Sequence, residues 1–107
     1  MRGRAELIRL IFISQNEKFD EENVTFEQWP SKKPSLKYGQ VPVLTLENGA
    51  QINESMAIAK YLARKANLYG KNDWEIYLID RAIDTVYVTL DFYPIVLYYR
   101  CRICMKK

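Results

Sequence analysis

The sequence predicts an α/β fold in which helices pack against a small sheet. Two observations lead to this prediction. Apolar residues recur at helical spacing in three segments, centred near residues 10, 60 and 82. Short apolar runs lie between the first two segments, and one of them is followed by the hairpin signal Asn48-Gly49.

Composition fits a globular protein and excludes several classes of function. The 107 residues, 49% of them apolar, suit one compact domain or a domain plus a fragment of another. The net charge of +3 comes from mixed signs, unlike the basic stripe of a nucleic-acid binder. With no histidine, imidazole catalysis and histidine metal ligation are excluded. No secretory signal is visible and no apolar run approaches the ~20 residues of a membrane span, so we expect a cytoplasmic protein without membrane contacts.

The elements of the predicted sheet domain follow in order. Residues 5–14 carry a dense apolar set and predict a largely buried helix. Residues 19–26 predict a short edge strand, and residues 28–39, rich in proline, lysine and serine, predict a loop with a helical turn. Residues 41–47 predict a strand that turns at Asn48-Gly49 and returns over residues 50–52.

Two longer helices complete the chain. Asn53 is the expected N-cap of a helix through Ala66. Asn72, with Glu75 three residues on, predicts a capping box that opens the second helix, which Pro94 should end or kink.

These elements divide the chain into two unequal parts. We expect an α/β domain at 1–66, a linker at 67–71 and the start of an all-helical domain at 72–107. Because the first domain opens on a helix, a parallel neighbour of its second strand is unaccounted for. The last helix likewise lacks a following element to cover its apolar face, so both ends look truncated.

One segment predicts a binding site for a small peptide. Pro42 stands at the start of a strand, where a cis Val41-Pro42 bond would present the backbone N–H and C=O of Val41 as a free edge. Glu54 and Ser55 follow the hairpin at a helix N-terminus, which is suited to an anion.

The motifs of the chain resemble those of cytosolic glutathione transferases, most closely the sigma-like class that includes prostaglandin D synthases. The resemblance runs from residue 3 to about 93, and it implies a thioredoxin-like glutathione-binding domain that lacks its first strand. The matching residues are Gly3-Arg4-Ala5-Glu6, Ile8-Arg9, Trp29-Pro30, Lys33, Gly39-Gln40-Val41-Pro42-Val43-Leu44, Asn53-Glu54-Ser55-Met56-Ala57-Ile58 and Tyr61-Leu62-Ala63-Arg64.

The resemblance assigns the γ-glutamyl and cysteinyl parts of glutathione to one set of residues. The cysteinyl backbone would pair antiparallel with Val41, which Pro42 holds in place. The γ-glutamyl carboxylate would bind the hydroxyl and backbone N–H of Ser55, and Glu54 would face the ammonium group.

The glycyl end of glutathione falls to a second set. The indole of Trp29 and the ammonium of Lys33 would hold the glycyl carboxylate, although Lys32 could serve equally, and Gln40 would add a side-chain contact.

The resemblance implies that this chain binds glutathione but catalyses its conjugation poorly. The family activates the glutathione thiol with a tyrosine on a strand before the Gly3-Arg4 segment, and the printed sequence begins on that segment. Arg4 resembles a residue that supports the thiolate, so we expect impaired conjugation of glutathione, the co-substrate, to a small hydrophobic electrophile. We expect no metal.

Partners and alternatives stay open. Family members donate an acidic residue across a dimer, but that position falls near Val88, with Asp91 slightly beyond, so either a homodimer or a heterodimer with a full-length subunit is possible. A non-catalytic glutathione-binding or dimer-interaction module is the alternative. A thioredoxin-type reductase built on Cys101 and Cys104 is a distant third, because that pair lies far from the first helix.

Overall fold

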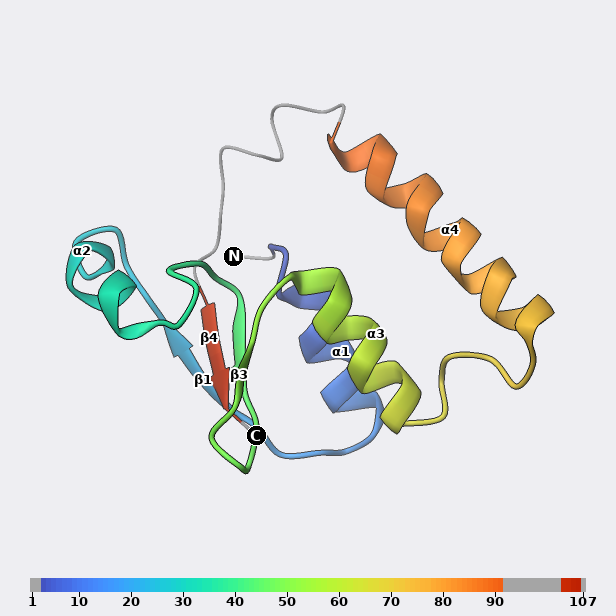
Figure 1. The fold of residues 1–107 in the computed structure, drawn as a ribbon, viewed down its shortest axis with the longest axis horizontal. Helices are drawn as coiled ribbons and strands as arrows, with labels where there is room; N and C mark the ends of the chain where they lie inside the picture. The colour runs from blue at the N-terminus through green and yellow to red at the C-terminus, as the bar shows by residue number, and fades with distance from the viewer. Residues whose placement is uncertain (1–2, 92–102, 107) are drawn as a thin grey trace.

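The computed structural model describes residues 3–91 and 103–106 as a mixed sheet with two helices packed on it and a long helix outside them (Figure 1). In chain order the elements are α1 (Glu6–Ser14), β1 (Asp20–Asn23), α2 (Trp29–Lys32), the 3₁₀ helix η1 (Lys33–Ser35), β2 (Val43–Thr45), β3 (Gln51–Ile52), α3 (Ser55–Lys65), α4 (Asp73–Asp91) and β4 (Ile103–Lys106).

The α/β fold is confirmed, and the sheet contains a strand that the sequence did not predict. The strand order is β1-β4-β2-β3, so β4, from the end of the chain, lies in the middle. It runs antiparallel to β1 and parallel to β2, with Met105 opposite both Glu21 and Leu44. The expected start of a helical domain at 72–107 therefore includes four residues that belong to the sheet. These residues supply β2 with the parallel neighbour that was unaccounted for.

The core lies between the sheet and the helices α1 and α3. Its members come from both helices and from the two central strands, which explains why these elements hold together. They are Ala5, Ile8, Phe12, Leu44, Ile58, Ala59, Leu62 and Met105.

Helix α1 is less buried than its composition predicted. Leu7, Leu10 and Ile13 are exposed, whereas Ile8 and Phe12 are buried. The helix packs on α3 and the sheet along one face only, so the prediction of a largely buried helix was wrong for the opposite face.

The two predicted N-caps have different outcomes. Asn53 is not the cap of α3, because the helix begins at Ser55 and Glu54 occupies the cap position with φ +66° and no side-chain capping bond. At α4, the Asn72 side chain accepts a hydrogen bond from the Glu75 N–H at 3.0 Å, as a capping box requires. The Glu75 carboxylate, however, accepts from the N–H of Lys71 at 2.7 Å.

The hairpin at Asn48-Gly49 is confirmed. Leu44 pairs with Ile52, and the N–H of Leu46 donates to the Ala50 carbonyl at 2.9 Å. Gly49 has φ +81°, a conformation that costs glycine little.

Polar contacts join helix α4 to the α/β domain. The Lys60 ammonium donates to the Asp80 carboxylate at 2.5 Å, and the Tyr69 hydroxyl donates to the same oxygen. The expected end of this helix at Pro94 lies outside the described residues. No helix in the described part of the chain has the length and apolar character needed to cross a membrane.

Candidate functional site

The Val41-Pro42 peptide bond is cis, as the sequence predicted. Strand β2 begins one residue later, at Val43, so Val41 precedes the ladder. Among the described residues, the backbone N–H and C=O of Val41 have no hydrogen-bond partner. Within that part of the chain, Val41 therefore offers a short edge to an extended peptide.

Trp29 and Val41 pack against the same apolar cluster. The cluster consists of Val24 and Leu36, and both Trp29 and Val41 are half-buried against it. Trp29 is the first residue of α2, because Pro30 suits an early helical position. The sequence placed Trp29 in a loop with one helical turn, and the structure assigns it to that turn.

The structure distinguishes the two lysines that the sequence could not separate. The Lys32 ammonium donates to both oxygens of the Glu22 carboxylate at 2.7 Å. Lys33 has no acidic partner among residues 3–91 and 103–106, and its aliphatic stem passes over Gly39, where an added Cβ would lie 3.4 Å from Lys33 Cε. Lys33 is therefore the lysine beside the segment that leads to Val41.

A side-chain contact joins this segment to the start of α3. The Asn53 amide donates to the Gln40 carbonyl oxygen at 3.3 Å. Glu54 is exposed, and its backbone carbonyl accepts the Ile58 N–H at 2.9 Å. Gln40, Val41 and Glu54 are thus brought to one end of the sheet domain.

Ser55 is the first residue of α3 and is only 6% exposed. Its hydroxyl lies 3.4 Å from the Tyr87 hydroxyl of α4, and either oxygen can donate. The backbone N–H groups of the first turn carry the positive end of the helix dipole, so an anion is favoured here. Sequence reasoning missed Tyr87, because only a long-range contact places it beside Ser55.

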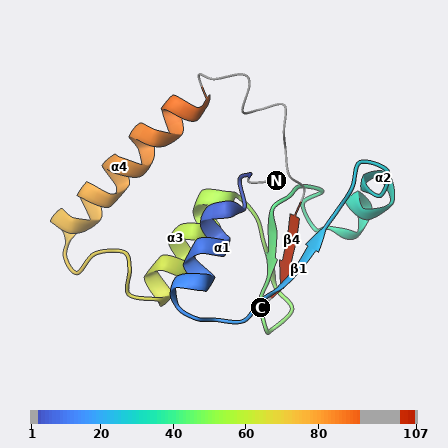
Figure 2. The ribbon, with the colours of Figure 1, turned by 180° about the vertical axis from the view of Figure 1, so that it is seen from behind.

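Arg4 lies in the turn before α1 and is exposed. Helices α1 and α3 run side by side and begin at the same end of the domain (Figures 1 and 2). Arg4 and Ser55 therefore share that end, although the role of Arg4 at a thiolate stays a prediction.

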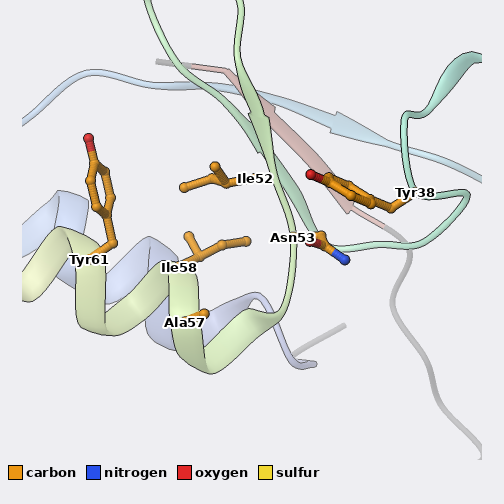
Figure 3. A pocket seen from close by; sticks show the side chains of 6 residues that line it. All are labelled: Tyr38, Ile52, Asn53, Ala57, Ile58 and Tyr61. Carbon is orange, nitrogen blue, oxygen red and sulfur yellow. The ribbon is translucent and has the colours of Figure 1, made fainter.

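A separate cavity of about 320 Å³ opens beside the site (Figure 3). Tyr38 and Tyr61 stand at its two ends, and Ile52 and Ile58 lie between them. Asn53 also lines it, but none of the predicted glutathione-binding residues does. The cavity is apolar and adjoins the predicted site without being part of it.

The perturbed ionisable groups stabilise the fold and do not line the predicted site. The pKa of Asp80 is lowered, first by the hydrogen bond from Lys60 and then by that from Tyr69. The pKa of Glu21 is lowered mainly by the Arg9 guanidinium, whose hydrogen bonds tie α1 to β1 at 2.7 and 2.9 Å.

Within the described ranges, no three acidic or cysteine side chains gather as metal ligands would. Of the two cysteines, Cys101 lies outside the described residues, and Cys104 is a ladder residue of β4.

Comparisons with known proteins bear on this arrangement. Residues 1–64 match the family model described as "Glutathione S-transferase, N-terminal domain". The chain is 38% identical over 94 residues to rat hematopoietic prostaglandin D synthase, covering 88% of this chain and 47% of the relative. It is 42% identical over 84 residues to a probable glutathione S-transferase 6 of Caenorhabditis elegans, covering 78% and 40%.

Solved structures of glutathione transferases are also similar to this chain. A Nu-class glutathione transferase from Haemonchus contortus superposes with a TM-score of 0.76 at 36% identity, covering 85% of this chain and 44% of that one. The chain thus spans about half the length of the curated relatives it matches.

Proposed function

Because this chain belongs to the glutathione S-transferase family, we propose that it binds glutathione and presents its thiol to small hydrophobic electrophiles. The observation that carries the proposal is that Val41, whose backbone has no partner among the described residues, and the buried Ser55 lie at one end of the sheet domain. A tripeptide needs both features, since one recognises its backbone and the other its γ-glutamyl carboxylate.

In this proposal the γ-glutamyl half of glutathione lies at the start of α3. Its carboxylate accepts the Ser55 hydroxyl and the helix N-terminal N–H groups, and the Glu54 carboxylate faces its ammonium. The cysteinyl backbone pairs with Val41, and the buried Pro42 fixes the direction of that edge.

The glycyl carboxylate would lie on the opposite side of Val41. Trp29 packs against the cluster that Val41 also contacts, and Lys33 lies over Gly39, so an indole N–H and an ammonium flank this end. Gln40 adds a polar contact between the two halves. Contacts of this kind are worth about 1 kcal/mol when neutral and roughly 1.5–3 when charged. After binding costs they support an affinity in the micromolar to millimolar range.

For the chemistry we propose that this chain presents the glutathione thiol as a thiolate. Arg4 is its candidate for thiolate support, and a guanidinium favours the thiolate by charge alone. A hydrogen bond worth about 1.5–3 kcal/mol corresponds to roughly one to two pKa units of the thiol.

Calorimetric titration with glutathione tests the binding site. Replacing Ser55 with alanine should weaken binding roughly 10- to 100-fold, because a hydrogen bond to a charged carboxylate is lost. Ser14→Ala is the matched control, since the exposed Ser14 hydroxyl donates to the Ile11 carbonyl and accepts from the Gln15 amide at the far end of α1. If Ser55→Ala stays within about twofold of the parent chain, the assignment of Ser55 is wrong.

A second candidate is a non-catalytic module that binds glutathione or pairs with a subunit of the same family. The observation in its favour is the apolar surface of α4, whose exposed members include Trp74, Tyr77, Leu78, Val86 and Val88. Turnover of an aromatic halide with glutathione separates the two candidates. A rate equal to the uncatalysed background, with glutathione binding retained, would favour the module.

A further inference from the structure

Tyr87 brings a hydroxyl from the long outer helix to the buried start of α3. It lies 32 positions after Ser55, and the two side-chain oxygens are 3.4 Å apart. Ser55 is the buried polar residue of the described part of the chain, and Tyr87 is half-buried. The contact is therefore sheltered from bulk water on the Ser55 side and reachable on the Tyr87 side.

The position of Tyr87 follows from how α4 lies along α3. Asp80 of α4 accepts from Lys60 of α3, and Tyr87, two turns later, meets Ser55 near the start of α3. From Asp80 to Tyr87 the residue numbers of α4 rise, while their partners on α3 fall from Lys60 to Ser55, so α4 is antiparallel to α3. The face of α4 that carries these contacts is marked by half-buried residues at helical spacing, namely Ile76, Ile79, Asp80, Ile83 and Tyr87.

We infer that Tyr87 is a further ligand-binding residue, a second hydroxyl donor to the γ-glutamyl carboxylate of glutathione. The inference rests on the proposed function. In the structure one of the two hydroxyls donates to the other across 3.4 Å, and the accepting hydroxyl keeps its own hydrogen for a further bond. A carboxylate between them accepts from both, because each oxygen has lone pairs for more than one bond.

The neighbouring position on α4 offers no polar side chain. Val88 is 56% exposed and apolar. Tyr87 lies on the face that meets Ser55, so this chain supplies a polar contact to the subsite from its own α4. A contact that only packs the helices together would act equally on every ligand, whereas a carboxylate donor acts only on ligands that have the carboxylate.

Titrations of the Tyr87→Phe variant with two ligands test the inference. The first ligand is glutathione, and the second is γ-aminobutyryl-cysteinyl-glycine, which lacks only the γ-glutamyl α-carboxylate. Loss of one hydrogen bond to a charged group should weaken glutathione binding about tenfold. Binding of the second ligand should be the same for the variant and the parent chain. Tyr77→Phe is the control, because Tyr77 lies on the same helix, is exposed and stacks on Trp74 at 5.3 Å.

The outcomes separate the inference from the proposed function. A parent chain that does not bind glutathione overturns the proposed function and the role of Tyr87 with it. If the parent chain binds and Tyr87→Phe stays within about twofold, only the role of Tyr87 fails. An equal loss for both ligands also overturns it, because the hydroxyl would then act through helix packing. Thermal melts of both phenylalanine variants show whether the fold is retained, and a loss confined to glutathione in a folded variant supports the inference.

Discussion

Met105 offers the sharpest test of the sheet arrangement, because it anchors the strand that the sequence did not predict. Its side chain is 1% exposed and lies in the core with Ile8, Phe12, Leu44 and Ile58. Replacing Met105 with alanine removes three heavy atoms from the centre of that core.

The expected loss follows from burial. Truncation of a fully buried methionine to alanine costs about 2–5 kcal/mol, from lost transfer free energy and the cavity left behind. A domain of this size has a total stability of ~5–15 kcal/mol, so the loss is a large share of it. At roughly 4–8 °C per kcal/mol, the melting temperature should fall by about 10 °C or more.

Urea unfolding followed by circular dichroism measures the free energy of unfolding. Met56→Ala is the matched control, because Met56 is half-buried on α3 and its truncation should cost about 1 kcal/mol or less. A Met105→Ala chain within about 0.5 kcal/mol of the parent would refute the central position of β4. Deleting residues 103–107 extends the test, since β1 pairs only with β4 among the described strands. The deleted chain should lose its cooperative transition.

Two further predictions concern a turn and a charge. Gly70→Ala should destabilise the fold by more than Gly49→Ala in the same urea assay. Both glycines have positive φ, so both substitutions strain the backbone. A Cβ at Gly70 would also lie 2.9 Å from the Ile76 nitrogen, whereas a Cβ at Gly49 would meet nothing within 4 Å. Equal losses would show that the close approach at Gly70 is relieved at no cost. Lys60 lowers the pKa of Asp80 in the folded state. The Asp80 carboxylate therefore stabilises the fold above its unfolded pKa of about 4, and this stabilisation disappears as the pH falls through the lowered folded pKa. Asp80→Asn should therefore be less stable at pH 7 and lose less stability between about pH 4 and pH 2, and a parallel pH profile for both chains would contradict this.

Local patterns were sufficient where neighbouring residues determine the structure. The hairpin at Asn48-Gly49 follows from a glycine that accepts positive φ, and the capping bond between Asn72 and Glu75 follows from their spacing. The same local reasoning gave a wrong prediction for the N-cap of α3. Asn53 is a good capping residue, but its amide instead donates to Gln40, and Glu54 takes the cap position.

Neighbours in space decided what the sequence left open at the site. Lys32 and Lys33 are equivalent in composition and spacing, and only the approach of Glu22 from β1 shows that Lys32 is paired. Tyr87 could not be assigned to the site either, because its contact with Ser55 depends on how α4 lies along α3.

The sequence by itself determined the helices, the hairpin, the cis Val41-Pro42 bond and the family, since each depends on short motifs or on their order along the chain. Only the tertiary structure decided which segment fills the middle of the sheet. Residues 103–106 carry no strong strand signal of their own, and they form β4 because β1 and β2 offer hydrogen-bonding edges on both sides and the core accepts Met105. Strand pairing between segments that are far apart in sequence depends on such matching edges, which local periodicity does not encode.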